Sequence, residues 1–569
     1  MASYLGQQMS LGTYNTGENG HVEYGWSEQM QEKIVQLNFQ LTRTTCNQPV
    51  LQTKFRELLL VLKNQKNSIS LSYLTTLYKL TAYTRDIISG KGEYQLTYML
   101  IKEWYDFFPQ LALNMLTHLV HKDNSDHPFG SWKDMKYFSK YCLSNGVPIN
   151  HEMIAHCISL INHQLKEDIK SDNPSLLAKW IPREKSSFGQ MYEPLACDYF
   201  KEYLQTAKSD VSKNKAKMKC KTHYRQLISS LNKKLETTQI FQCNQVWSYI
   251  NFNKVTSITV SKQKLAFLNK LKNGKQRKEV QDRVTCAENF KSHIQESIDS
   301  KKDVKGKRVS MEDFTNSADN LLFRSRLDNI DLQVEIDLLN SQWRNNATET
   351  KAMGKFIPMV DVSGSMSGTP MAVAIALGIR IAEKSILGNR VITFSQHPSW
   401  INLEKLDGFV SKVDVVTKMP WGMNTNFYAA LDLILNSIIE SKLEPAAVSD
   451  LILVILSDMQ MDSADSESSS TTLFDNIKNK YHEAGMRVCG KPYIPPHIVM
   501  WNLRSTSGFP SLSFQSNATM ISGFSPVLLN NFCEKGILGL KESTPWNNLL
   551  DSLKKYDYLK DDVIANYIM

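Results

Sequence analysis

Three separate segments in the second half of the chain carry hydroxyl and carboxylate side chains that together suit a metal ion. Asp361, Ser363 and Ser365 form the loop DVSGS. Thr425 stands further on in WGMNTNF, and Asp458 follows an apolar run in LILVILSDMQ. Hydroxyl and carboxylate oxygens are hard ligands that favour Mg²⁺, with Ca²⁺ or Mn²⁺ as alternatives, over zinc. The sequence therefore predicts a divalent-metal cofactor, most directly Mg²⁺, held by these five residues.

The elements that must position these residues alternate between strands and helices from Phe356 onward. Strand-like runs are FIPMV, NRVITFS, DLILVILSDMQ, PHIVMWNLR and NATMISGFS, and the segments between them include TPMAVAIALGIRIAEK, TNFYAALDLILNSII and TLFDNIKNKYHEAG. Apolar strands separated by helices predict a doubly wound α/β fold, with a mostly parallel sheet covered on both faces. Ligands of such sheets collect at the carboxyl ends of the strands, where Asp361 and Asp458 are expected.

Other interpretations of the DVSGS loop remain open. An Asp with nearby serines also serves as a turn or helix cap, and a formed site could be purely structural. A phosphatase of the aspartyl-phosphate type needs a second acid at the position of Ser363, and no lysine completes such a site. No catalytic triad, paired catalytic carboxylates or nucleotide loop is evident, so we expect no enzymatic activity. A metal-dependent phosphohydrolase is the remaining enzymatic alternative.

The first half of the chain has a helical pattern. FRELLLVLKN, LSYLTTLYKLTAYTRDII and YQLTYMLIKEWYDFF place apolar residues three and four apart, with short connectors between them. We expect a flexible arm at 1–25, an all-α helical-repeat domain at 26–347 with a basic insertion near 262–310, the α/β domain at 355–535, and a helical extension at 536–569. The sequence does not indicate which domain the extension packs on.

The positive charge of the chain lies in this helical half. Residues from 355 onward carry 18 basic and 21 acidic side chains, a net charge of −3, whereas residues 1–354 carry 48 and 36, a net charge of +12. This asymmetry permits an anionic partner such as RNA, and a solvated lysine-rich surface is the alternative. The candidates for phosphate contact, chosen by composition alone, are Lys213, Lys215, Lys217, Lys219, Lys221, Arg225, Lys270, Lys272, Lys275, Arg277 and Lys278.

A smaller basic group lies in the string AKWIPREKSS (178–187). Lys179, Arg183 and Lys185 could bind an anion together or form a structural ion-pair network with Glu184. Trp180 in the same string could stack on a base or anchor helix packing. The sequence leaves both pairs of interpretations open.

Membrane and secretory signals are not evident. No run of about 18 apolar residues occurs, and the polar start MASYLGQQMS lacks the basic-then-apolar order of a signal peptide. The nine cysteines are dispersed without a CxxC pair, which is typical of reduced thiols. We therefore expect a cytoplasmic protein with no membrane partner.

The DxSxS loop, the later threonine and the aspartate after a further strand resemble the metal-ion-dependent adhesion site of von Willebrand factor A domains. The resemblance implies that Ser363, Ser365 and Thr425 ligate the metal directly, and that Asp361 and Asp458 act mostly through bound waters. It also implies that the sixth position takes water or a carboxylate from a protein partner.

The order of a helical-repeat region before such a domain resembles the Ro autoantigen (TROVE-module) architecture. TRDIISGKGE (84–93), GSWKDM (130–135), AKWIPREKSS (178–187) and SGFSPVLL (522–529) resemble a family of plants and giant viruses that pairs a TROVE-like, HEAT-like helical region with an A-type domain. The Ro resemblance implies a helical ring for small structured or misfolded RNA, without transferring individual contacts. We therefore expect a non-enzymatic binding protein with an acidic protein partner and an RNA partner. The alternative is an assembly component of a giant-virus particle, located in the virion or host cytoplasm.

Overall fold

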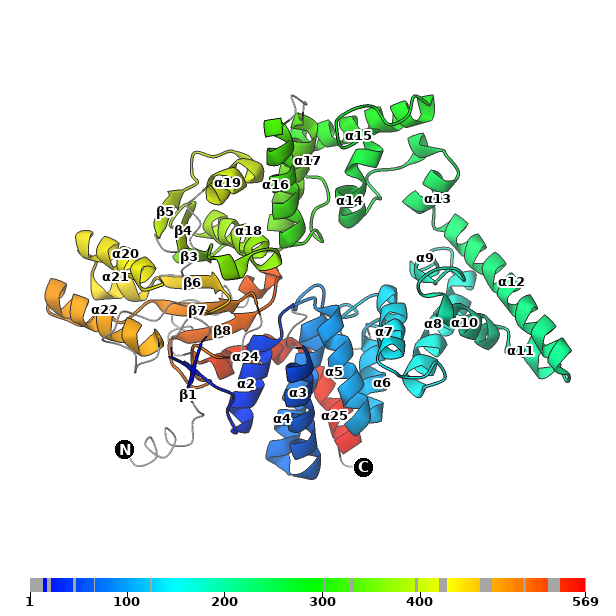
Figure 1. Ribbon diagram of the computed structural model, residues 1–569, viewed down its shortest axis with the longest axis horizontal. Helices are drawn as coiled ribbons and strands as arrows, with labels where there is room; N and C mark the ends of the chain where they lie inside the picture. Colours follow the sequence, from blue (N-terminus) through cyan, green and yellow to red (C-terminus); the bar gives the residue numbers. More distant parts are fainter. Residues whose placement is uncertain are drawn as a thin grey trace.

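The helical region forms an arch that starts and ends on one α/β sheet (Figure 1). The computed structural model describes residues 14–17, 22–43, 48–65, 67–122, 125–300, 302–327, 332–394, 398–418, 427–460, 473–504, 508–530 and 543–567. Helix α2 packs on the last strand of the sheet, and the last helices of the arch pack on the first helices of the α/β region. The chain thus builds one continuous body in which the sheet joins both ends of the arch.

The outgoing side of the arch consists of helices packed against their neighbours in sequence. They are α2 (Met30–Gln40), α3 (Gln48–Asn64), α4 (Ser68–Arg85), α5 (Tyr94–Phe107), α6 (Pro109–His118), α7 (Trp132–Ser144), α8 (Glu152–Lys170), α9 (Leu177–Trp180), α10 (Tyr192–Tyr199), α11 (Lys201–Gln205) and α12 (Asp210–Lys234). The expected periodicity is visible in α3, which buries Leu51, Phe55, Leu58 and Leu62 on one side. The predicted helical first half of the chain is therefore confirmed.

The returning side of the arch has a hydrophobic core of its own. This side of the arch comprises α13 (Thr238–Cys243), α14 (Ser257–Phe267), α15 (Gln281–Asp299), α16 (Met311–Leu327) and α17 (Gln333–Ala347). Phe252, Phe267, Phe290 and Ile294 form a cluster separate from the main core, and Leu338 of α17 joins it. The stretch expected as a basic insertion near 262–310 is thus packed around this second core over α14 and α15.

The sheet has six strands in the order β5-β4-β3-β6-β7-β8. They are β3 (Phe356–Asp361), β4 (Arg390–Phe394), β5 (Ser399–Asn402), β6 (Ile452–Ser457), β7 (His497–Asn502) and β8 (Ala518–Ser522). All pairings are parallel except that of β4 with β5. Every residue of β3, β6 and β7 is buried, which requires cover on both faces because successive side chains point to opposite sides. The predicted α/β sheet is confirmed, with the short antiparallel edge strand β5 as an addition that the sequence did not indicate.

The helices of the α/β region are α18 (Thr369–Lys384), α19 (Gly408–Thr417), α20 (Phe427–Glu440), α21 (Pro445–Ser449) and α22 (Leu473–Cys489), with 3-10 turns η3 (Gly364–Met366) and η4 (Pro526–Leu529). Helix α18 packs on β3, β4 and β6, and also on α16 of the arch. Because α18 is apolar on almost its whole circumference, it can be buried on both sides, between the sheet and the arch.

The C-terminal helices pack on the outgoing side of the arch. Helix α24 (Pro545–Leu553) lies against β8, α2 and α4, and α25 (Lys560–Tyr567) lies against α4 and α6 after the 3-10 segment η5 (Lys554–Leu559). Tyr556 donates a hydrogen bond to buried Asp86 at 2.7 Å. The C-terminal segment therefore ties the sheet to the first helices of the chain.

The N-terminal segment also docks on the α/β region. Strands β1 (Tyr14–Thr16) and β2 (Val22–Tyr24) form an antiparallel pair, and the backbones of Tyr24 and Phe509 exchange two hydrogen bonds of 3.0 Å. Within the segment expected as a flexible arm over 1–25, the structure describes 14–17 and 22–25, where backbone pairing holds β2 in place. In the described parts of the chain, no helix combines the length and apolarity that crossing a membrane requires.

Candidate metal site

Asp361 and Asp458 lie at the carboxyl ends of two neighbouring parallel strands. Asp361 is the last residue of β3, and Asp458 follows Ser457, the last residue of β6. The order of the sheet reverses between these strands, because β4 lies on one side of β3 and β6 on the other. Such a switch point is where doubly wound sheets open a crevice for ligands. The strands formed by FIPMV and LILVIL thus place both carboxylates at the same edge of the sheet.

The DVSGS loop brings its polar groups toward this point. Asp361 accepts hydrogen bonds from the backbone N–H of Ser363 at 2.9 Å and from Ser457 Oγ at 2.6 Å. The hydroxyl oxygens of Ser363 and Ser365 lie 3.1 Å apart. Ser363 is buried and Ser365 is half-buried, so the hydroxyl pair leads from the interior toward the surface.

The electrostatics of the site favour a bound cation. Both Asp361 and Asp458 are fully buried. The pKa of Asp361 is raised to about 7, because burial and the nearby charge of Asp458 raise it more than the hydrogen bonds from Ser363 and Ser457 lower it. Two neighbouring buried carboxylates destabilise each other unless a positive charge stands between them.

Arg504 supplies one positive charge at the rim of this site. Its Nη1 lies 3.4 Å from Asp458 Oδ2 and donates to the carbonyl oxygen of Ser365 at 3.3 Å. Arg504 follows β7, so it reaches the same sheet edge as the two carboxylates. Arg504 was not among the residues predicted from the sequence, although its position after the apolar run PHIVMWN places it at this sheet edge.

The donor set fits a hard divalent cation. Two carboxylates and two hydroxyls supply only oxygen atoms, as Mg²⁺ and Ca²⁺ prefer. Within the described residues, no three His, Cys, Asp or Glu side chains form a metal-binding cluster, so a metal here would need the serines. Thr425 lies outside the described residues. The structure therefore brings Asp361, Ser363, Ser365 and Asp458 together and leaves the fifth predicted residue without a description.

The N-terminal strand β2 reaches the same neighbourhood. Gln460, whose backbone N–H donates to Asp458 at 3.1 Å, donates its side-chain amide to Glu23 Oε2 at 3.5 Å. Glu23 is buried, and a Cβ on Gly508 would lie 1.7 Å from its carboxyl carbon, so its carboxylate packs directly on that glycine. Nothing in the sequence indicated that Glu23 would contact the segment after β6.

The basic candidates of α12 are partly engaged within the protein. Lys217 pairs with Glu193 at 3.1 Å, and Lys221 and Arg225 pair with Glu184 at 3.0 and 2.8 Å. Lys213 pairs with Asp210, and Lys219 lies 4.1 Å from the ring centroid of Tyr203. Of the predicted phosphate contacts on α12, Lys215 is the one that forms no ion pair or ring contact within the described part of the chain.

The second basic segment is more available. Residues 271–278 form the connection between α14 and α15, with backbone hydrogen bonds from Leu271 to Lys275 and from Arg277 to Asn269. The side chains of Lys272, Lys275, Arg277 and Lys278 are exposed, and none forms an ion pair within the residues described. Lys270 begins the same turn by a bridge to Gln276. This turn thus presents its cations to solvent.

Three of the four distinctive sequence strings contain contacts between distant parts of the chain. Lys91, in TRDIISGKGE, donates to Ser522 Oγ, in SGFSPVLL, at 2.7 Å. Arg85 of the first string forms a two-point pair with Asp134 of GSWKDM at 2.8 and 2.7 Å. These strings therefore include residues with a structural role in addition to any contact with a ligand.

Comparison with known proteins gives two matches. A family described as a domain of unknown function (DUF7788) matches residues 355–561, which span the sheet and the C-terminal helices. The chain is also 29% identical over 497 residues to "Uncharacterized protein L728" of Acanthamoeba polyphaga mimivirus, covering 83% of this chain and 78% of that protein. The similarity to a giant-virus protein therefore extends over both the helical arch and the α/β region.

Proposed function

We propose that the α/β region is a von Willebrand factor A-like module that binds an acidic protein partner through a divalent metal. Asp361, Ser363, Ser365 and Asp458 would hold the ion together with Thr425. The observation that carries the proposal is the pair of buried carboxylates at the switch point of the sheet, with two serine hydroxyls 3.1 Å apart beside them. A divalent ion, most directly Mg²⁺, would neutralise the carboxylates and offer a coordination position to a partner's carboxylate.

The hydrogen bonds of Asp361 support binding over catalysis. Both of its carboxyl oxygens already accept a donor, from Ser363 N–H and Ser457 Oγ. A nucleophilic aspartate needs an oxygen directed at the substrate and an acid or base beside it. The arrangement therefore favours a metal-bearing docking site over a phosphohydrolase.

For the helical arch we propose RNA as the anionic partner, in a TROVE-like role. The support is the +12 charge of residues 1–354 and the exposed cations of the turn between α14 and α15. Lysine and arginine side chains without carboxylate partners can neutralise phosphates and release their counterions. The paired cations of α12 contribute less to this surface.

The docking proposal is tested by metal-dependent capture of protein partners. Tagged full-length protein is mixed with an extract of its native source, in Mg²⁺ or in EDTA, and captured proteins are identified. We expect partners that are retained in Mg²⁺, lost in EDTA, and lost with Ser363→Ala or Thr425→Ala. Asp407→Asn, at an exposed aspartate before α19, is the matched control and should retain them. Capture that neither EDTA nor the two site variants change would overturn the proposal.

A second candidate function is a component of a giant-virus particle. The observation that favours it is the similarity to the mimivirus protein over 83% of this chain. In that case the α/β region would bind another particle protein. Quantitative proteomics of purified particles should find the protein at a constant ratio to the major components, and its absence from washed particles would exclude this role.

A further inference from the structure

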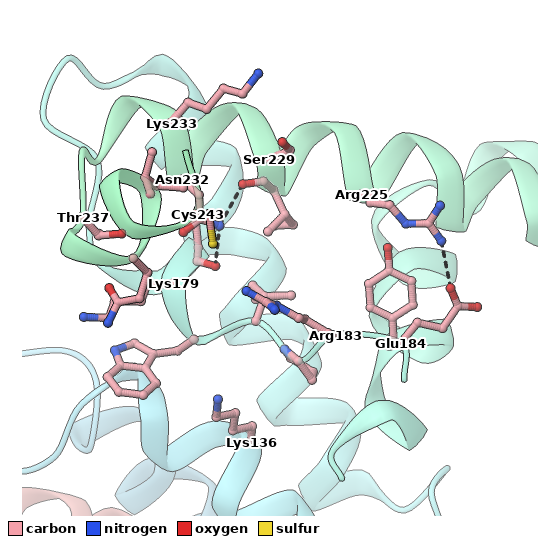
Figure 2. Close-up of a pocket in the computed structure, with 18 of the residues that line it drawn as sticks. Lys136, Lys179, Arg183, Glu184, Arg225, Ser229, Asn232, Lys233, Thr237 and Cys243 are labelled. Carbon is pink, nitrogen blue, oxygen red and sulfur yellow. Dashed lines mark hydrogen bonds and ion pairs between the residues drawn. The ribbon is translucent and has the colours of Figure 1, made fainter. Parts of the chain in front are cut away.

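A large cavity lies where α9 and the segment after it meet α12 and α13, far along the arch from the candidate metal site (Figures 1 and 2). Its volume is about 1020 Å³, which is sufficient for a nucleotide-sized ligand. Helix α7 contributes Lys136, α12 contributes Ser229 and Asn232, and α13 contributes Gln239 and Ile240. The string AKWIPREKSS, whose role the sequence left open, forms one wall.

The walls of the cavity are strongly basic. Six basic side chains and one acidic side chain line it, namely Lys136, Lys179, Arg183, Lys185, Arg225, Lys233 and Glu184. Glu184 pairs with Arg225 at 2.8 Å and with Lys221 at 3.0 Å, as the dashed contact in Figure 2 illustrates for Arg225. The other five cations form no ion pair within the described part of the chain. Of the two alternatives for Lys179, Arg183 and Lys185, the ion-pair network with Glu184 has no contact among the described residues, because Glu184 pairs with Lys221 and Arg225, and this favours the anion-binding alternative.

Three ammonium groups surround the indole of Trp180. Lys133, Lys136 and Lys179 lie 5.9, 5.1 and 5.6 Å from its ring centroid. Burial and the nearby charge of Lys133 together lower the pKa of Lys136 to about 8, and burial also lowers the pKa of Lys179. Crowded, partly desolvated cations gain from an anion placed among them.

Part of the lining is apolar, and one buried acceptor near it is unsatisfied. Ile181, Pro182, Ile228 and Ile240 contribute hydrocarbon surface. The Oε1 atom of Gln239 is buried and accepts no hydrogen bond from any residue that the structure describes. Buried acceptors without partners are rare, so a ligand that carries an N–H donor would complete this group. A highly charged sugar phosphate would leave the apolar wall unused.

We propose that this cavity binds a nucleoside phosphate whose base carries an amino group, adenine or cytosine. The phosphate lies among Lys136, Lys179 and Arg183, and the planar base lies against Trp180 and the apolar wall. Rotation of the half-buried Gln239 side chain would expose its enclosed Oε1 to the exocyclic amino group of the base. Proteins commonly bind such ligands through two contacts. Cations without a carboxylate partner bind the phosphate, and an aromatic side chain stacks on the base.

The same chemistry has two sources, a free nucleotide and the phosphorylated end of an RNA strand. The proposal depends on neither the metal site nor the exposed turn between α14 and α15. Binding should therefore persist in EDTA and in the Asp361→Asn variant, so that failure of the metal proposal and failure of this one are distinguishable.

The test is isothermal titration of the full-length chain in EDTA with AMP, UMP, inorganic phosphate, inositol hexakisphosphate, and RNA oligonucleotides with and without a 5′-phosphate on a terminal adenosine. We expect AMP to bind more tightly than UMP, inorganic phosphate and inositol hexakisphosphate. Lys136→Gln and Lys179→Gln should each weaken AMP binding by roughly tenfold or more, because each removes a charge-assisted contact. If the phosphorylated oligonucleotide binds more tightly than AMP, the ligand is the end of an RNA strand. If AMP binds more tightly, the ligand is the free nucleotide.

Two further variants keep the test specific. Lys140 lies on the same helix α7, is exposed and does not line the cavity. Lys140→Gln should therefore leave AMP binding unchanged. Gln239→Leu keeps the side-chain volume and removes the acceptor, so it should abolish the preference for AMP over UMP. Undetectable AMP binding, AMP binding that survives both lysine variants, or equal binding of UMP and AMP to the unmodified protein would overturn the proposal.

Discussion

The ammonium nitrogen of Lys91, in the loop between α4 and α5, lies 2.7 Å from Ser522 Oγ at the end of β8. It also donates to the carbonyl oxygens of Asn38 at 2.6 Å and Leu41 at 3.1 Å, which end α2. One buried side chain therefore connects the loop after α4 and the end of α2 to the last strand of the sheet. The placement of the sheet relative to the arch depends on such contacts.

Lys91 should make stability depend on pH. Burial lowers its pKa to about 7. The unfolded chain holds this proton up to about pH 10.4, so between about pH 7 and 10 the unfolded state binds more protons and stability rises with pH. Below about pH 7 the cost of the buried charge is fully present. Lys91→Met should remove this dependence and cost about 1–3 kcal/mol at high pH through the lost donors.

The measurement is the difference in unfolding midpoint between the unmodified protein and Lys91→Met at pH 6.5 and pH 9.5. The deficit of the variant should be larger at pH 9.5. An equal deficit at both values, or a larger one at pH 6.5, would contradict the assigned pKa and its direction. Lys102→Met, a partly exposed lysine on α5 beside Glu103, controls for the general effect of losing a charge.

The pair of Arg85 and Asp134 should be among the most costly to break. Asp134 is buried and also accepts from Tyr98 OH at 2.6 Å and from the backbone N–H of Ser131 at 2.8 Å. Burial raises the pKa of Asp134, but the charge and hydrogen bonds of Arg85 outweigh it and hold the pKa below its ordinary value. Asp134→Ala would leave Arg85 buried without its counter-ion, which should lower the free energy of unfolding by about 3–5 kcal/mol.

Urea unfolding of Asp134→Ala and of a matched surface variant tests this value. Asp106→Ala breaks a pair of similar length, 2.7 Å to Arg56, in an exposed position, and should cost less than about 1 kcal/mol. Comparable losses for the two variants would show that burial is not what makes the Asp134 pair important.

Much of the α/β region could be predicted from its sequence because its strands are buried on both faces. Continuous apolar runs such as LILVIL can only be interior elements, and an acid directly after each run must lie at the sheet edge. The placement of Asp361 and Asp458 at one edge of the sheet could therefore be predicted from their positions after the apolar runs. Thr425 was predicted by the same logic and stays a prediction.

The long-range contacts could not be predicted in the same way. Glu23, Lys91 and Ser522 are far apart in sequence, and no periodicity indicates that a lysine in SGKGE is buried against a distant strand. Strand β5 was missed because four residues with only one buried side chain give little alternation. The packing partners of the C-terminal helices could not be predicted either, because an amphipathic helix does not specify the surface on which it packs.

Arg504 should weaken metal binding. Its guanidinium lies 3.4 Å from Asp458 Oδ2, so it competes with a cation for that carboxylate. Its side chain is 40% exposed, which reduces the repulsion by solvent screening. Arg504→Gln should tighten Mg²⁺ or Mn²⁺ binding by about three- to tenfold, measured by calorimetry. Arg487→Gln, at an exposed arginine of α22, should not change it, and weaker binding by Arg504→Gln would contradict this role.

The turn between α14 and α15 should dominate salt-dependent RNA binding. Lys272→Gln with Lys275→Gln removes two exposed cations, so the slope of log affinity against log salt should fall by roughly 0.7 for each lost phosphate contact of a single strand. Lys217→Gln with Lys221→Gln removes two cations that are paired with Glu193 and Glu184, and should change the slope less. Filter binding at several salt concentrations measures both, and a larger effect of the second pair would contradict the assignment.

The most direct test of the central claim is a calorimetric titration of Mg²⁺, with Mn²⁺ in parallel, into full-length protein that has been stripped with EDTA and desalted. We expect one saturable site that Asp361→Asn, Ser363→Ala and Thr425→Ala each weaken severely and that Asp407→Asn leaves unchanged. No saturable binding, or a site that survives all three substitutions, would contradict a metal at the DVSGS loop.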